Sequence, residues 1–316
     1  MFAGSQGCTV AETILHHFDL SPFAEKARLM LGLKRLPWRS VEIPLVMPKP
    51  ELTALTGGYR KTPVLQIGAD IYCDTRLIAV ELERRFPQPS LFPDGQRGLA
   101  LALCAWSDRA FFEPGAGLSM GTNRNGLPKA IIDDRKAFFN FMDFDRLEVD
   151  IRHLTTQLKA QADLVDQTLA DGRPYVLGAA PGLADINAYF PMWMVRSNVA
   201  AAASILKDFG HLASWEERVR ALGHGDRTPM TAEQALEIAR SSTPSPGAGV
   251  DPGDALGLAA EAPVVVVPED YGRVPVSGSL VTLQLHEVAI RRTDPRAGTV
   301  VVHFPRIGYR VERATT

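Results

Sequence analysis

The spacing of apolar residues changes several times along the chain, and each change marks an expected element. Residues 13–18 form a short β-prone run, and apolar positions over residues 23–31 recur at the three- and four-residue spacing of a helix. Residues 38–43 alternate as a second strand, residues 64–73 have the pattern of a hairpin around a Gly-Ala-Asp turn, and residues 75–86 return to helical spacing. The first part of the chain is therefore predicted to fold as β-α-β followed by β-β-α.

Capping and turn residues support this order. Ser21 is placed to cap the first helix, and Pro22 falls at its first position, where a missing N–H costs nothing. Residues 44–50 are proline-rich and irregular, and a brief helix is expected between them and the two glycines at 57–58. Thioredoxin-like domains have this order of elements, so residues 13–93 are predicted to form a thioredoxin-like α/β domain.

The helical signal dominates residues 94–240, which predicts an all-α second domain. Residues 183–195 form an almost wholly apolar helix, and Thr231 with Gln234 makes a capping box for a last helix that ends near Arg240. Residues 113–129 are rich in Gly, Pro and Asn, and we expect a long loop there. A longer helix carries one apolar stripe, formed by Ile151, Leu154, Leu158, Val165 and Leu169.

Three segments differ in composition from both domains. Residues 241–262 begin with a stretch rich in Ser, Pro and Gly, which predicts a flexible linker. Short β-branched runs separated by Pro and Gly then predict a small antiparallel all-β module over residues 263–316, barrel-like or sandwich-like. Residues 1–12 are small and polar without periodicity and are expected to be a flexible leader.

Composition narrows the class of protein. The 316 residues carry 34 Lys and Arg against 36 Asp and Glu, so a nucleic-acid partner is disfavoured. No apolar run approaches the ~18 residues of a membrane span, and the start of the chain lacks the pattern of a secretory signal. Three cysteines are too few for a disulfide framework, and the adjacent His16 and His17 point to opposite faces of a strand. We expect a cytoplasmic protein without a metal site or a membrane partner.

Ser21 is the first candidate for chemistry. A hydroxyl at a helix N-terminus lies where backbone N–H groups and the helix dipole favour negative charge. Because a thiol has a reference pKa of roughly 8.5, such a position would raise the ionised fraction of a bound thiol. On these residues alone, a simple helix cap is the more economical interpretation of Ser21.

Two further motifs admit similar alternatives. Pro63 opens a strand before the hairpin, and if the preceding peptide is cis, the Thr62 backbone can pair with a ligand along the sheet edge. Asp74 and Thr75 begin the third helix, where free N–H groups suit a carboxylate and Asp74 suits an ammonium. Taken singly, an ordinary proline at a strand start and an ordinary helix cap also explain them.

Together these motifs resemble those of cytosolic glutathione transferases over about residues 13–240. The matching segments occur in the family's order and spacing: residues 21–25 (SPFAE), 62–65 (TPVL) and 74–75 (DT), with residues 49–51 (KPE) as in omega-like members and residues 183–186 (LADI) similar to the family's buried helix-capping motif. The resemblance implies a thioredoxin-like α/β domain and an all-α transferase domain, here followed by the β module. It also implies a glutathione site and a homodimer.

The resemblance assigns a role to each matched residue. Ser21 would donate to the glutathione sulfur, and Thr62 would pair its backbone with the cysteinyl part, with Pro63 cis. Asp74 and Thr75 would hold the γ-glutamyl end, and Lys49 would meet the glycyl carboxylate or nearby backbone. An apolar second-substrate pocket is expected at Phe23, Phe111 and Phe112.

The predicted function is a glutathione-dependent transferase in which the thiolate attacks a small apolar electrophile. Omega-like members carry cysteine where this chain has Ser21, and because serine cannot form a mixed disulfide, thiol-exchange reduction is disfavoured. Gly182 stands where the family usually has Ser or Thr in the capping motif. The extra module motivates an alternative, a non-catalytic binding or scaffold protein on this fold. A glutathione-dependent lyase, isomerase or peroxidase is a third reading.

Overall fold

The structure, a computed structural model, describes residues 12–314. Its first unit has the predicted thioredoxin-like order, and β1 pairs in parallel with β2 and antiparallel with β3, which pairs antiparallel with β4. The predicted leader lies, apart from Glu12, outside the described residues. The elements of this unit are β1 (Ile14–His17), α1 (Pro22–Leu33), β2 (Pro37–Glu42), α2 (Pro50–Thr56), β3 (Val64–Ile67), β4 (Asp70–Cys73) and α3 (Thr75–Arg85).

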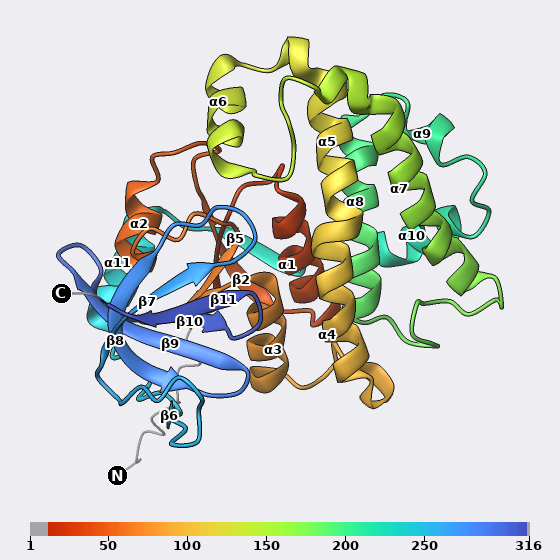
Figure 1. Cartoon of the computed structure of the whole chain (residues 1–316). Helices are drawn as coiled ribbons and strands as arrows, with labels where there is room; N and C mark the ends of the chain where they lie inside the picture. Colours follow the sequence, from red (N-terminus) through yellow and green to blue (C-terminus); the bar gives the residue numbers. More distant parts are fainter. Residues whose placement is uncertain (1–11, 315–316) are drawn as a thin grey trace.

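A helical domain follows and stands beside α1 and α3 (Figure 1). Its apolar stripe on α7 and the apolar helix α8 are as predicted, and they share one core with α1 and α3. Helix α8 packs against both α1 and α5. The helical elements are α4 (Arg97–Trp106), the π-helical turn η2 (Ser107–Phe111), α5 (Phe112–Asn123), α6 (Lys129–Phe138), α7 (Leu147–Leu169), α8 (Leu183–Asn198), α9 (Ala202–Ile205) and α10 (Leu212–Arg220), with short 3₁₀ turns η1 (Pro93–Gly95) and η3 (Arg124–Gly126).

The long loop expected at residues 113–129 is wrong, because most of this segment is helix α5. Its glycines serve helix packing. A Cβ at Gly115 would come within 3.0 Å of Met194 Cε on α8, and one at Gly117 within 3.0 Å of Leu154 Cδ1 on α7. The glycines let α5 approach two neighbouring helices closely, and that tertiary gain outweighs their low helix propensity.

The buried helix cap of α8 explains why Gly182 replaces Ser or Thr. A Cβ at Gly182 would lie 2.8 Å from Pro93 Cδ and 3.0 Å from the Leu91 carbonyl oxygen, so no side chain fits. Asp185 performs the capping from inside the helix: its Oδ2 accepts from the Gly182 N–H at 3.0 Å, and its Oδ1 accepts from Trp215 Nε1 at 2.9 Å.

The segment after α10 leaves the helical domain before residue 240, where the sequence had placed the boundary. Strand β5 (Asp226–Pro229) pairs in parallel with β2, at the edge of the thioredoxin-like sheet. Helix α11 (Ala232–Ser241) has the predicted Thr231–Gln234 capping box, and it packs against α2, β2 and β10. These two elements therefore belong with the sheet.

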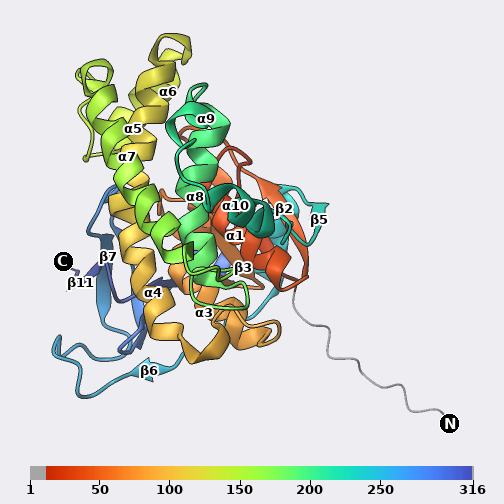
Figure 2. The same ribbon diagram turned by 90° about the vertical axis from the view of Figure 1, so that its right-hand side faces the viewer.

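The C-terminal strands continue the same sheet. Strand β10 pairs in parallel with β4, and the sheet runs in the order β11-β7-β8-β9-β10-β4-β3-β1-β2-β5. Figure 2 shows β5 and β2 on one side of the molecule and β7 and β11 on the other. The strands are β6 (Gly249–Val250), β7 (Pro263–Pro268), β8 (Val276–Leu283), β9 (Glu287–Asp294), β10 (Gly298–Pro305) and β11 (Tyr309–Arg313).

We call β7–β11 the C-terminal module. Its strands pair antiparallel among themselves, as predicted, but their apolar side chains share a core with α2 and α11 rather than closing on one another. The predicted linker is also tied down, since the Ser245 hydroxyl donates to Asp70 Oδ2 at 2.7 Å and β6 pairs with β8. Within residues 12–314, no helix is both long and apolar enough to cross a bilayer.

Candidate functional site

One cavity of about 440 Å³ lies where the thioredoxin-like unit, the helical domain and the C-terminal module meet. All the residues predicted for the glutathione site line it, together with two of the three aromatic residues predicted for the second pocket. They are Ser21, Lys49, Thr62, Pro63, Asp74 and Thr75, with Phe23 and Phe112. These positions come from separate parts of the sequence, and the fold brings them to one place.

Ser21 caps α1, as its sequence position predicts. Its Oγ accepts from the Ala24 N–H at 3.2 Å, so the hydroxyl proton is left to donate elsewhere. The Ser21 carbonyl accepts from the Glu25 N–H at 3.0 Å, and Pro22 has no N–H. The Phe23 N–H therefore remains as the first-turn donor that the cap does not use. Ser21 can therefore cap α1 while its hydroxyl proton and the Phe23 N–H remain available to bind an anion.

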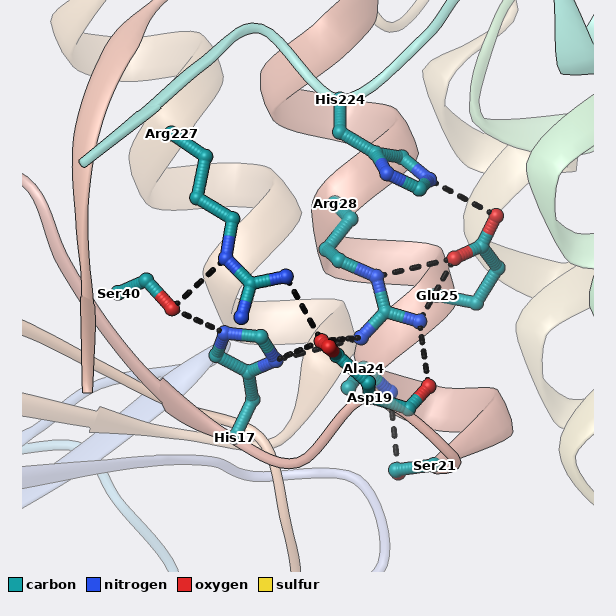
Figure 3. A network of polar contacts seen from close by, with 9 residues as sticks. All are labelled: His17, Asp19, Ser21, Ala24, Glu25, Arg28, Ser40, His224 and Arg227. Carbon is teal, nitrogen blue, oxygen red and sulfur yellow. Dashed lines mark hydrogen bonds and ion pairs between the residues drawn. The ribbon is translucent and has the colours of Figure 1, made fainter. Parts of the chain in front are cut away.

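A buried polar network holds the β1–α1 loop that carries Ser21 (Figure 3). Arg28, on α1, donates to the Asp19 carbonyl at 3.0 Å, to Glu25 Oε2 at 2.7 Å and contacts His17 Nδ1 at 3.2 Å. Burial, with Arg28 next in effect, lowers the pKa of His17 to about 3. The ring is thus neutral and can accept from the guanidinium. These contacts tie α1 to the loop through the Asp19 carbonyl.

Strand β5, which forms the edge of the sheet beside β2, contacts the same loop. Arg227 donates to Asp19 Oδ1 at 2.8 Å and to Ser40 Oγ at 3.0 Å, as Figure 3 shows. His224 contacts Glu25 Oε1 at 3.0 Å. The segment after the helical domain therefore contributes to the placement of Ser21, and sequence analysis gave no sign of this.

Thr62 lies just before the β3 ladder. The Thr62–Pro63 peptide bond is cis, and strand pairing of β3 starts at Val64. The backbone of Thr62 therefore stands outside the ladder while the residue lines the cavity. Thr62 and Ser21 thus line the same cavity.

Asp74 has a distinct charge environment among the cavity carboxylates. Its Oδ1 accepts from the Arg76 N–H at 2.9 Å, and its Oδ2 accepts from the Tyr309 hydroxyl at 3.1 Å. Over residues 12–314, no cationic side chain lies within ion-pair distance of Asp74. Each of the other three has at least one: Asp108 pairs with Lys26, Asp134 with Arg60 and Arg135, and Asp270 with Lys61.

Lys49 is the corresponding unpaired cation. The residue is only 6% exposed, and within the described part of the chain its ammonium makes no hydrogen bond or ion pair, lying 5.3 Å from the centre of the Phe18 ring. Burial lowers the pKa of Lys49 to about 8, and the nearby Arg135 adds to the shift. The cavity thus presents one unpaired carboxylate and one unpaired ammonium.

The remainder of the wall is aromatic. The Phe23 and Phe112 rings meet edge to face at 4.8 Å, and Phe138, Phe139 and Tyr271 close the cavity on the side of α6 and the C-terminal module. The prediction for Phe111 is wrong. It ends the π-helical turn and is fully buried in the helical core, 5.2 Å from the Trp106 ring, so it does not line the cavity.

Several cavity residues were missed by sequence analysis. Lys61 adjoins the Thr62-Pro63 motif, and that adjacency is the one sequence signal for any of them. The others have no local signal, because they reach the cavity only through tertiary structure: Asp108 from η2, Arg135 from α6, and Asp270 and Tyr271 from the loop between β7 and β8.

Comparison with known proteins identifies the class. Residues 15–90 match the sequence profile of the glutathione S-transferase N-terminal domain, and residues 134–222 match that of the glutathione S-transferase C-terminal domain. The chain belongs to the glutathione S-transferase family.

A solved GST-like protein from Pseudomonas syringae is 37% identical, with a TM-score of 0.79, and the match covers 96% of this chain and 100% of that one. Because the match covers 96% of this chain, it must include strands of the C-terminal module. A glutathione S-transferase from Rhodospirillum rubrum, 23% identical with a TM-score of 0.54, covers 66% of this chain and 88% of that one, and shows the fold.

Among curated proteins, FtsZ-localized protein A of Caulobacter vibrioides is 31% identical over 105 residues. The alignment spans 32% of this chain and 46% of that relative, so it covers less than half the length of the curated protein.

Proposed function

We propose that the protein is a glutathione-dependent transferase that joins the glutathione sulfur to a small apolar electrophile. The observation that carries the proposal is the pair of unpaired charges, Lys49 and Asp74, in the same cavity as the Ser21 hydroxyl. Glutathione offers a carboxylate at one end, an ammonium at the other and a thiol between them, which matches these three groups.

Each end of glutathione has a designated partner in this proposal. Asp74 binds the γ-glutamyl ammonium, and the N-terminus of α3 at Thr75 receives the γ-glutamyl α-carboxylate. The Thr62 backbone pairs with the cysteinyl residue as an added strand would. The Lys49 ammonium meets the glycyl carboxylate.

The chemical step needs the sulfur as a thiolate. The Ser21 hydroxyl and the free Phe23 N–H stabilise the anion at the start of α1 and so lower the thiol pKa. The thiolate then forms a C–S bond to the electrophile, whose leaving group departs with the bonding electron pair. The aromatic wall around Phe23 and Phe112 binds the apolar part of the electrophile. A lyase would instead eliminate a fragment of the substrate and an isomerase would rearrange the substrate, both without leaving a glutathione conjugate as the product, and a peroxidase would yield oxidised glutathione, so product analysis separates these reactions.

Ser21→Ala tests the role of the hydroxyl, and Ser21→Thr is the matched control that restores it. Removing one hydrogen bond to a thiolate costs ~1–3 kcal/mol, so kcat/KM toward a chloronitrobenzene should fall about tenfold to a hundredfold in Ser21→Ala. Affinity for S-methylglutathione, which has no thiol to ionise, should change little. Full turnover by Ser21→Ala would contradict the proposal.

A second candidate is a non-catalytic binding or scaffold protein. The likeness to FtsZ-localized protein A favours it over other non-enzymatic functions. Inactivity toward a broad electrophile panel, combined with a tight protein partner that is lost on deletion of residues 250–316, would support this candidate against the transferase.

We also infer a homodimer, as family membership suggests. The β4 edge of the thioredoxin-like sheet is occupied by β10, so a second copy must bind elsewhere on the surface. Light scattering measures the mass in solution, and a monomer at all concentrations would refute the inference.

A further inference from the structure

Through Tyr309, the C-terminal module contacts Asp74, the carboxylate proposed above to bind the γ-glutamyl ammonium. Tyr309 begins β11, and its hydroxyl lies 3.1 Å from Asp74 Oδ2. The hydroxyl of Tyr59, on the segment after α2, lies 2.7 Å from that of Tyr309. A strand from the far end of the sequence therefore touches the carboxylate assigned to the ligand ammonium.

The direction of these hydrogen bonds follows from the chemistry of the groups. Burial raises the pKa of both Tyr59 and Tyr309 well above the ordinary value, with the charge of Asp74 adding to the shift, so both hydroxyls keep their protons. An ionised carboxylate can only accept, so Tyr309 donates to Asp74. The Tyr309 oxygen then accepts from Tyr59, which gives a chain of donors that ends on Asp74.

These donors orient the carboxylate without neutralising it. Asp108 and Asp270 line the same cavity, but each lies against a lysine ammonium, Lys26 and Lys61 respectively. A carboxylate with a cation already beside it has less to gain from a ligand ammonium. Asp74, held by the Tyr309 O–H and the Arg76 N–H, keeps its full charge for the ligand.

Tyr309 is itself firmly held. Its ring packs 5.5 Å from that of Phe304 on β10, and the Lys61 ammonium lies 5.8 Å from the ring centre. Its backbone pairs with Pro268 of β7. A donor fixed in this way restricts the rotation of the Asp74 side chain, which reduces the entropy lost when the ligand binds.

We propose that Tyr309 is a positioning residue for glutathione, holding Asp74 in the orientation that binds the γ-glutamyl ammonium, and that the C-terminal module is thereby part of the binding site. This inference rests on the proposed function. It assigns to the module a role in ligand recognition within the same chain.

The test is calorimetric binding of two ligands, glutathione and its des-amino analogue, in which hydrogen replaces the γ-glutamyl ammonium. In Tyr309→Phe, which keeps the ring, the Kd for glutathione should rise about tenfold. The Kd for the analogue should stay within about twofold of the wild-type value, because Asp74 has no ammonium to bind. Tyr59→Phe, which removes the outer donor, should give a smaller change in the same direction.

Tyr72→Phe is a matched control. Tyr72 is a buried tyrosine on β4, and its hydroxyl contacts Arg85 Nη2 at 3.5 Å, away from the cavity. Its glutathione affinity should equal that of the wild type. Equal losses for both ligands in Tyr309→Phe, or no loss for either, would overturn the positioning role. Failure of the wild-type protein to bind glutathione at all would instead overturn the proposed function, and this inference with it.

Discussion

The helical domain and the C-terminal module cover the thioredoxin-like unit in two different ways. The helical domain packs against α1 and α3 mainly through one apolar core, to which the Lys26–Asp108 ion pair between α1 and η2 is added. The module also shares an apolar core, with α2 and α11, but it attaches by adding β10 to the edge of β4. A helix face can be covered by apolar surface alone, whereas a sheet edge also requires partners for its polar groups.

The polar partners at the module's attachment are titratable. His303 on β10 contacts Asp70 Oδ1 on β4 at 3.1 Å and Glu287 Oε1 on β9 at 2.6 Å, and its ring stacks on Tyr72 at 4.4 Å. Burial alone would lower the pKa of His303, but the two carboxylates outweigh it, so the net shift is upward. We call this set the strand junction. The stability of the module's attachment should therefore depend on pH differently from that of the helical domain.

The largest expected effect comes from truncating a buried aromatic side chain in each of the two apolar cores. Phe304 in the module and Phe111 in the helical core are both fully buried, and truncating either to alanine should lower the free energy of unfolding by about 3–5 kcal/mol. Because the module shares its core with α2 and α11, calorimetry of Phe304→Ala should still show a single transition at a lower temperature. Two separate transitions, with only the first displaced, would mean that the module folds independently.

His303→Phe sharpens the comparison at the strand junction. It keeps a ring on Tyr72 but leaves the buried Asp70 without its cation, which at pH 6 should cost about 3 kcal/mol. The folded pKa of His303 is raised, so its contribution is complete below the unfolded pKa of about 6.5 and is lost as the pH rises through the folded value. The difference from wild type should therefore shrink toward pH 9.

The difference in unfolding free energy between the two proteins has to be measured, because other histidines change the stability with pH in the opposite direction. Burial lowers the pKa of His16 to about 4 and that of His17 to about 3, so both destabilise the folded state as the pH falls below 6.5. Urea unfolding of both proteins at pH 6 and pH 9 isolates the strand junction. A difference that does not depend on pH would show that His303 carries no charge there.

A smaller effect is expected at the proposed glutathione site. With S-methylglutathione as ligand, Lys49→Gln should bind about tenfold more weakly at pH 7, because the glycyl carboxylate loses its charged partner. The free protein's Lys49 has a pKa of about 8, so wild-type affinity should fall above that pH and the gap between the two proteins should narrow. A constant ratio of the two Kd values from pH 7 to pH 9.5 would place the glycyl carboxylate elsewhere.

The sequence predicted best those features that depend on neighbouring residues. The Ser21 cap, the apolar helix α8 and the Thr231 capping box are local patterns, and the structure has all three. The glycines of α5 led to the wrong prediction of a loop. They are needed because α5 packs closely against α7 and α8, and no local sequence pattern contains that contact.

The same limit applies to the site. Ser21, Thr62 and Asp74 each stand at the end of a strand or helix, where spacing marks them in the sequence. Asp270 lines the cavity and Tyr309 contacts Asp74 because β10 joins β4, and strand-edge pairing leaves no short motif.

Calorimetric titration of the wild-type protein with glutathione at pH 7 tests the central claim most directly. We expect measurable heat, one site per chain, and a melting temperature that rises with ligand concentration. Absence of both heat and thermal shift at millimolar glutathione would contradict it, and the cavity would then belong to a protein that keeps the family's fold without its ligand.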